Sequence, residues 1–171
     1  LRMKIEPGSE EGKSKIIIDN NKKFPAHFTV SKDNLGNKFT GVQRTNFSSN
    51  FDNLLFLNDN LNLNYSTNLH DSNKVKDIRS ISGSLSIPFK YNTLSLDYSR
   101  SEFKGQTPGQ NGPSSLTGFS TQRKVTLDRV LLSHGNLRIS GSTSLTTKES
   151  ASFIAGLLSQ PSQRKLTIAN L

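Results

Sequence analysis

Residues 60–69 have the sequence Asn-Leu-Asn-Leu-Asn-Tyr-Ser-Thr-Asn-Leu, in which every second side chain is polar and most of those between are apolar or aromatic. Successive side chains of a β-strand point to opposite sides of the sheet, so this strand has an apolar face and a face of Asn and Ser. The same alternation recurs at 82–89, 93–99 and 137–146. It suits a soluble sandwich and equally a transmembrane barrel with lipid outside and water within.

The composition excludes several classes of protein. Of the 171 residues only 32% are hydrophobic, and the mean hydropathy is −0.53. No run approaches the ~20 apolar residues of a spanning helix, whereas barrel strands, which turn half their positions to the lumen, look hydrophilic overall. The absence of Cys excludes disulfides, thiol chemistry and zinc–thiolate sites. The net charge is +9, but the basic residues are dispersed and no RNA-binding or zinc-finger pattern occurs, so we expect no nucleic-acid partner.

No catalytic or metal-binding pattern occurs in the sequence. The three histidines lack the spacing of a metal site, since they stand at His27, His70 and His134. The Gly-rich segment 105–112 lacks the Lys-Ser/Thr pair and the following helix of a phosphate-binding loop. We therefore expect neither an enzyme nor a bound cofactor or metal.

The spacing of turn-forming residues along the chain predicts an all-β fold. Apolar or alternating runs, separated by Gly, Pro, Asn and Asp, predict strands at 13–19, 27–32, 39–47, 61–69, 78–89, 93–103, 116–132, 137–148 and 164–171. The long strand at 116–132 is expected to contain a bulge near Arg129. Helical spacing is found only at 151–158, where Gly156 and the nearby Pro161 oppose a helix.

One turn has a strong local signal. The sequence Asp-Asn-Leu-Gly-Asn at 33–37 predicts a hairpin between the second and third of these strands. In this hairpin Gly36 is expected to supply a positive φ, and Gly41 to relieve crowding.

The connections alternate in character along the chain. Those at 51–59, 90–92 and 133–136 are tight, and those at 70–77, 105–115 and 149–163 are long and polar. Transmembrane barrels have short periplasmic turns and long extracellular loops, and their strands need about 9–11 residues to span the bilayer. The pattern therefore favours a barrel over a soluble sandwich.

Three segments also resemble, in the same order, the two-partner secretion transporters of the outer membrane, which are the haemolysin-activator and filamentous-haemagglutinin secretion proteins. They are Ile5-Glu6-Pro7-Gly8 with Gly12-Lys13-Ser14, Asp33-Asn34-x-Gly36 with Thr40-Gly41, and Asp52-Asn53-Leu54 with Leu57-Asn58-Asp59. The motif residues carried over from the family are Pro7, Gly8, Asp33, Asn34, Gly36, Gly41, Asp52 and Asn53.

The resemblance implies a sixteen-stranded antiparallel β-barrel in the outer membrane of a Gram-negative bacterium, preceded by periplasmic polypeptide-transport-associated domains. Residues 1–24 would be the end of the second such domain, with its last strand, and residues 25–171 the first seven to eight barrel strands. The chain begins without Met and ends within a predicted strand, so we expect a fragment that is unstable alone in a membrane, because a half-barrel leaves its edges unpaired.

In function, the resemblance implies a pore that moves a large haemolysin- or adhesin-like exoprotein to the cell surface without nucleotide hydrolysis. The side chains expected to face the lumen are Asn62, Asn64, Ser66, Ser84, Ser86, Ser95, Asp97, Arg138, Ser140, Ser142 and Ser144. Those expected to face outer-membrane lipid are Leu61, Leu63, Tyr65, Leu85, Ile87, Leu94, Leu96, Tyr98, Leu137 and Ile139. Two alternatives stay open: a related β-barrel assembly factor, and a soluble or surface-exposed all-β binding module of an adhesin.

Overall fold

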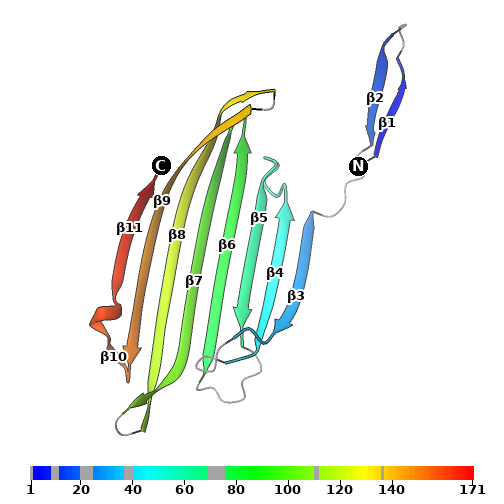
Figure 1. Cartoon of the computed structure of the whole chain (residues 1–171). Helices are drawn as coiled ribbons and strands as arrows, with labels where there is room; N and C mark the ends of the chain where they lie inside the picture. The colour runs from blue at the N-terminus through cyan, green and yellow to red at the C-terminus, as the bar shows by residue number, and fades with distance from the viewer. Residues whose placement is uncertain are drawn as a thin grey trace.

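The computed structural model describes residues 2–8, 12–19, 25–36, 41–68, 76–109, 112–135 and 137–171. Strands β1 (Arg2–Pro7) and β2 (Ser14–Asp19) pair as a separate two-stranded sheet. All other strands belong to one antiparallel sheet, shown in Figure 1. They are β3 (Ala26–Asp33), β4 (Arg44–Asp52), β5 (Asn60–Thr67), β6 (Asp77–Phe89), β7 (Asn92–Gly109), β8 (Gly112–His134), β9 (Leu137–Ile154), β10 (Leu157–Leu158) and β11 (Arg164–Asn170).

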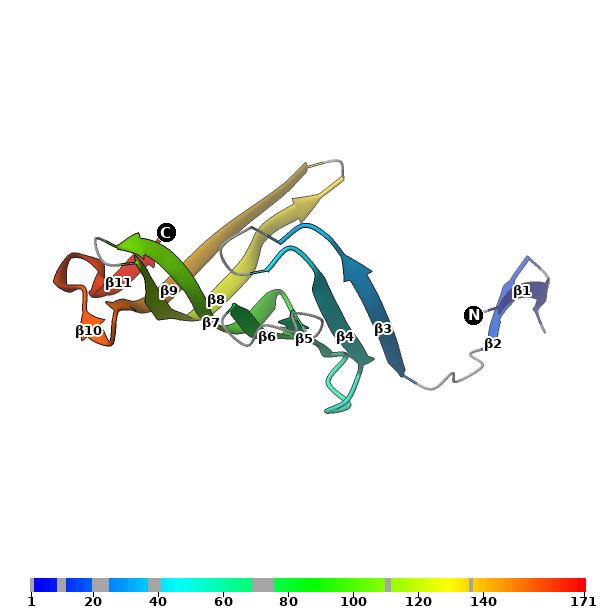
Figure 2. The same cartoon turned by 90° about the horizontal axis from the view of Figure 1, so that it is seen from below.

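The large sheet is a meander in which each strand from β3 to β9 pairs with the next. Both β10 and β11 pair with β9, and a short 3₁₀ turn (Gln160–Ser162) separates them. Seen from below in Figure 2, the sheet curves between β3 and β11 but does not close on itself. The predicted all-β antiparallel fold is confirmed.

Because neighbouring strands are antiparallel, successive connections lie alternately at the two ends of the sheet. We call the end that carries 53–59 and 90–91 the turn end; it lies at the top of Figure 1. The opposite end, where β6 begins and β7 runs into β8, is the loop end. The predicted bulge is present as a register shift between Val130 and Leu132. Strand β5 is the third strand of the large sheet and pairs with β4 and β6.

Two predicted loops are wrong. Most of 105–115 is strand, because β7 and β8 continue as a paired ribbon as far as Gly109 and Gly112. Strand β9 likewise continues to Ile154, so 149–154 pairs with β8 instead of forming a loop. Gly, Pro and Ser lower the strand signal of these segments, but a partner strand satisfies their backbone hydrogen bonds.

The N-terminal part contains two paired strands, β1 and β2, whereas the sequence predicted one strand there, at 13–19. Strand β4 begins at Arg44, later than the predicted start at 39. Residues 37–40 and 69–75, which include Thr40 and most of the predicted loop at 70–77, lie outside the described residues.

The glycine roles in the first hairpin differ from the prediction. Gly36 does not have a positive φ; it is a close-approach residue, since a Cβ there would collide with the carbonyl oxygens of Gly41 and Val42. Gly41 has the positive φ, +109°. It does also relieve crowding, because a Cβ at Gly41 would lie 2.6 Å from Nδ2 of Asn68. The expected Asp33 turn is present, with the N–H of Leu35 donating to Oδ1 at 2.9 Å.

Candidate functional site

The strand register gives the large sheet two chemically different faces. Asn62 of β5 lies opposite Asn50 and Ser84, and Ser84 lies opposite Asp97. We call the side that these residues share the polar face, and the side that Leu61 and Leu63 share the apolar face. Strand alternation and pairing put on the polar face all eleven residues predicted to line a lumen: Asn62, Asn64, Ser66, Ser84, Ser86, Ser95, Asp97, Arg138, Ser140, Ser142 and Ser144.

Side-chain hydrogen bonds connect the polar face across strands. Nδ2 of Asn60 donates to Oδ1 of Asn50 at 2.9 Å, and Nδ2 of Asn62 donates to Oδ1 of Asn60 at 2.6 Å. The Oγ of Ser66 donates to Oδ1 of Asn46 at 2.7 Å. On β4 and β5, neutral amides and hydroxyls therefore satisfy one another.

Sequence reasoning missed Asn46 and Asn50 as members of this face. Both lie on β4, where polar Ser48 and Ser49 stand side by side in the sequence and interrupt the alternation. Asn46 also donates through Nδ2 to Oδ2 of Asp33 at 2.8 Å, and Arg44 forms an ion pair with Asp33 at 3.0 Å. This network joins the loop ends of β3 and β4.

Around the row from Leu96 to Leu145, the exposed fractions of apolar and polar side chains are inverted relative to those of a soluble protein. On the apolar face Leu96 is 39% exposed, Val125 46% and Leu145 51%. On the polar face Ser144 is only 9% exposed and Thr146 5%. Among the described residues the sole buried hydrophobic side chain is Ala151, against seven buried polar ones. A soluble sheet buries its apolar face against a second layer, so this arrangement fits an apolar surrounding medium.

The apolar residues form a band that crosses the sheet diagonally. One cross-strand row is apolar over five strands, from Leu61 through Leu85, Leu96 and Val125 to Leu145. Two positions nearer the loop end, the row that begins at Leu63 already becomes polar at Arg123. Two positions further, the row that begins at Tyr65 becomes polar at Arg100. The band thus ends earlier on each successive strand.

The tight turns follow the same diagonal. Asn60, the first residue of β5, lies opposite Ser86, and β6 extends three residues further, to Phe89. Strand β8 extends five residues, to His134, beyond Arg129, which lies opposite Asn92. The line of tight turns and the loop-end limit of the apolar band therefore cross the strands obliquely in the same direction. A barrel whose strands tilt by about 35–45° has this geometry.

The turn at 53–59 contains the predicted motif residue Asn53, which follows Asp52 at the end of β4, and it contains Asp59, which determines its shape. Asn53 has φ 57°, and its Oδ1 accepts the N–H of Asn58 at 2.8 Å. The buried carboxylate of Asp59 accepts the N–H groups of Leu54, Leu55 and Leu57 at 3.1, 2.9 and 3.3 Å. Asp52 ends β4 and accepts Nδ2 of Asn60 at 2.7 Å. Asp59 is part of the segment Leu57-Asn58-Asp59 that resembles the family. Its hydrogen bonds to the backbone of the turn could not be predicted from the sequence, because they depend on how the turn folds.

The other motif residues lie in turns or at the strand ends beside them. Pro7 ends β1, and the N–H of Gly8 donates to the carbonyl of Lys13 at 2.8 Å, which closes the β1–β2 turn. Asn34 follows directly after β3. The eight motif residues are therefore not assembled into one site; they shape three separate turns.

Among the residues that the structure describes, no group of three or more His, Cys, Asp or Glu could hold a metal ion. Within the same residues, no helix has the length and apolarity needed to cross a membrane.

Comparisons with known proteins agree with this geometry. The chain is 28% identical over 173 residues to the outer membrane transporter CdiB of Dickeya dadantii, covering 100% of this chain and 30% of that protein. It is 32% identical over 120 residues to the hemolysin transporter protein HpmB of Proteus mirabilis, covering 69% and 21%. The chain thus spans about 30% of the length of the curated CdiB relatives.

Solved structures are similar over nearly the whole chain. CdiB from Escherichia coli matches with a TM-score of 0.83 and 26% identity, over 97% of this chain and 31% of that one. CdiB from Acinetobacter baumannii matches with a TM-score of 0.71 and 27% identity, over 97% and 32%. The open sheet is therefore part of an outer-membrane β-barrel, and the chain is an outer-membrane protein of a Gram-negative bacterium.

The family model described as haemolysin secretion/activation protein ShlB/FhaC/HecB matches residues 12–171, nearly the whole chain. Together with the inverted faces and the tilted apolar band, this match shows that the chain belongs to the ShlB/FhaC/HecB family of two-partner secretion transporters.

Proposed function

We propose that the protein is the pore component of a two-partner secretion pair, which passes a large haemolysin- or adhesin-like exoprotein to the cell surface without nucleotide hydrolysis. The observation that carries the proposal is the inverted exposure of the sheet, with shielded Ser144 and Thr146 on one side and exposed Leu96 and Leu145 on the other. The relatives also support it, since CdiB is named as an outer membrane transporter and HpmB as a hemolysin transporter protein.

In this proposal the polar face lines the pore. Asn60 and Asn62 already satisfy part of their hydrogen-bonding capacity through each other and Asn50. Such a wall solvates a passing polypeptide backbone by exchanging weak, neutral hydrogen bonds, each worth about 0.5–1.5 kcal/mol net, and it holds no side chain tightly. The eleven polar-face residues named above are the proposed pore wall, and the apolar face is the proposed lipid contact.

The proposal also includes the division of the chain. Residues 1–24 would be the end of a periplasmic polypeptide-transport-associated domain, and residues 25–171 the first barrel strands. The pairing of β1 only with β2 supports a boundary between β2 and β3. With this division the turn end faces the periplasm and the loop end faces outward.

Neighbouring residues on one strand allow a direct test, because the chain contains no Cys. Single substitutions Ser84→Cys and Leu85→Cys would be made in the protein as its gene encodes it, in cells whose exoprotein is stalled during export by a fused, tightly folded domain. We expect a short bifunctional cross-linker to join the exoprotein to Cys at position 84 and not to Cys at position 85. The opposite preference would refute the proposed pore wall, and absence of cross-linking at both, with export intact, would refute the route along this face.

A further inference from the structure

The row of apolar-face residues that begins at Leu63 has a gap in it. Gly83 lies between Leu63 on β5 and Tyr98 on β7, and it has no side chain to fill the space between them. A hollow of about 440 Å³ results, with Leu85, Leu96 and Val125 among the residues that line it. Every neighbouring position on this face carries a large side chain, so the hollow is a local feature of the band.

The same row ends in a positive charge. Arg123 lies opposite Tyr98 and lines the hollow. Among the described residues it has no hydrogen-bond or ion-pair partner. An unpaired guanidinium beside an apolar hollow is costly unless an anion or water reaches it, and on a lipid-facing strand the cost of Arg is about 2–4 kcal/mol near the midplane. Arg123 stands at the loop-end limit of the apolar band on β8, which in the proposed orientation is away from the midplane.

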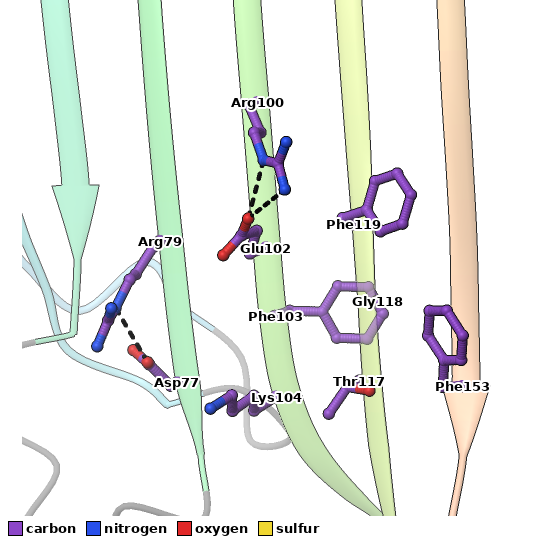
Figure 3. A pocket seen from close by; sticks show the side chains of 10 residues that line it. All are labelled: Asp77, Arg79, Arg100, Glu102, Phe103, Lys104, Thr117, Gly118, Phe119 and Phe153. Atoms are coloured by element: carbon purple, nitrogen blue, oxygen red, sulfur yellow. Dashed lines mark hydrogen bonds and ion pairs between the residues drawn. The ribbon is translucent and has the colours of Figure 1, made fainter. Parts of the chain in front are cut away.

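A charged pocket adjoins the hollow on its loop side. It has a volume of about 230 Å³ and is shown in Figure 3. Arg79 pairs with Asp77 at 3.1 Å, and Arg100 pairs with Glu102 at 2.7 Å. Arg100 of the pocket lies two residues beyond Tyr98 of the hollow on the same face of β7, so the pocket and the hollow lie next to each other on the sheet.

This surface carries an excess of positive charge. Its cations on the apolar face are Arg79, Arg100, Lys104 and Arg123, and its carboxylates there are Asp77 and Glu102. Asp97 and Lys124 also line the hollow, but they lie opposite each other on the polar face. Both Nε and one terminal nitrogen of Arg100 bind the same oxygen, Oε1 of Glu102, which leaves further N–H donors of the guanidinium for a ligand. The Arg100 guanidinium also lies 5.7 Å from the centre of the Phe119 ring, which holds it in place.

We propose that this surface binds one phosphorylated lipid of the outer leaflet, with an acyl chain in the hollow over Gly83 and the phosphate at Arg123 and Arg100. The inference rests on the proposed orientation of the sheet, with the apolar face toward lipid and the loop end outward. An apolar slot that ends in an excess of guanidinium groups matches an amphiphile with an anionic head, because arginine binds phosphate through several parallel hydrogen bonds.

The test uses the protein as its gene encodes it, purified in a mild detergent and titrated with diphosphoryl lipid A. Native mass spectrometry measures the fraction of protein that retains one lipid. We expect Arg123→Gln and Gly83→Val each to raise the Kd about tenfold, through loss of a charged hydrogen bond and of roughly two buried methylene groups. Arg123→Lys should retain most of the affinity.

Matched controls separate this site from general effects of the substitutions. Arg164→Gln removes an arginine from the polar face on β11, and Gly141→Val fills an apolar-face glycine outside the hollow. Both should bind lipid as the unsubstituted protein does. The migration shift between heated and unheated samples on a gel verifies that each variant holds a folded barrel.

Three results would overturn the inference: unchanged affinity in Arg123→Gln and Gly83→Val, equal affinity for dephosphorylated lipid A, or displacement of the lipid by millimolar inorganic phosphate, which would indicate a site for the free anion. Export of the exoprotein is measured in parallel. Loss of lipid binding with normal export supports the lipid site independently of the pore, whereas failure of the cross-linking test with normal lipid binding counts against the proposed pore wall alone.

Discussion

The carboxylate of Asp59 accepts the backbone N–H of Leu55 at 2.9 Å, across a seven-residue turn, 53–59, that contains no glycine. The same side chain also accepts the N–H groups of Leu54 and Leu57, and it is only 2% exposed. One buried carboxylate therefore holds three backbone donors that would otherwise lack partners at the tip of the β4–β5 hairpin.

Replacing Asp59 by Ala should destabilise the protein. Hydrogen bonds to a charged group contribute about 1.5–3 kcal/mol, so we expect a loss of roughly 2–3 kcal/mol in the free energy of unfolding, measured by denaturant titration in detergent. Asp52→Ala serves as the control, because the Asp52 carboxylate accepts one side-chain bond in an exposed setting. Its cost should stay below about 1 kcal/mol. Equal costs at the two positions would contradict the capping role of Asp59.

Asn53 tests the backbone of the same turn. Its φ of 57° lies in the left-handed region, and its side chain accepts the N–H of Asn58. Substitution by Ala loses the hydrogen bond and meets a steric cost of about 1–2 kcal/mol, whereas Gly loses the hydrogen bond without that cost. Asn53→Gly should therefore unfold at a higher denaturant concentration than Asn53→Ala. The reverse order would mean that chain entropy, and not φ, dominates at this position.

Adjacent residues of β5 test the two faces. Leu63→Arg puts a charge on the apolar face and should lower the stability of the folded protein in the membrane by about 2–4 kcal/mol. Asn64→Arg puts the same charge on the polar face and should be tolerated. Leu96→Arg on β7 should behave like Leu63→Arg. The measurement is the amount of folded protein in isolated outer membranes. Equal yields from Leu63→Arg and Asn64→Arg would show that the faces are assigned wrongly.

Gly118 on β8 should be far less tolerant of a side chain than Gly83 on β6. A Cβ at Gly118 would lie 2.7 Å from ring carbons of Phe103 and 2.9 Å from the carbonyl oxygen of Ala151, which belongs to a paired strand and cannot move aside. At Gly83 the nearest atom is the flexible tip of Leu63, at 3.1 Å. Overpacking costs about 1–3 kcal/mol, so Gly118→Ala should lower unfolding stability and Gly83→Ala should leave it nearly unchanged. Comparable losses in denaturant titration would refute this difference.

Much of the fold could be predicted from local patterns. The alternation at 60–69 placed the side chains of β5 correctly on two faces, and the turn residues near Asp33 and Asp52 marked real hairpin ends. The predicted strand ends were wrong where the amino-acid composition is typical of a loop but the backbone pairs with a neighbouring strand. At 105–115 the residues are those of a loop, yet β7 and β8 pair through most of it. The role of Gly36 was also misjudged, because a close approach between Gly36 and Gly41 is a contact across the turn.

What the sequence alone determined is the chemistry of each strand, since an alternation of period two is fixed by neighbouring residues whatever the partner strand. Only the tertiary structure decided how the rows align from strand to strand. The alignment of Leu63, Gly83, Tyr98 and Arg123 in one row follows from hairpin lengths and from the bends and tilt of the whole sheet. The shielded Ser144 and Thr146 likewise lie opposite Asn170 and Ile168 of β11, a pairing that neither strand contains by itself.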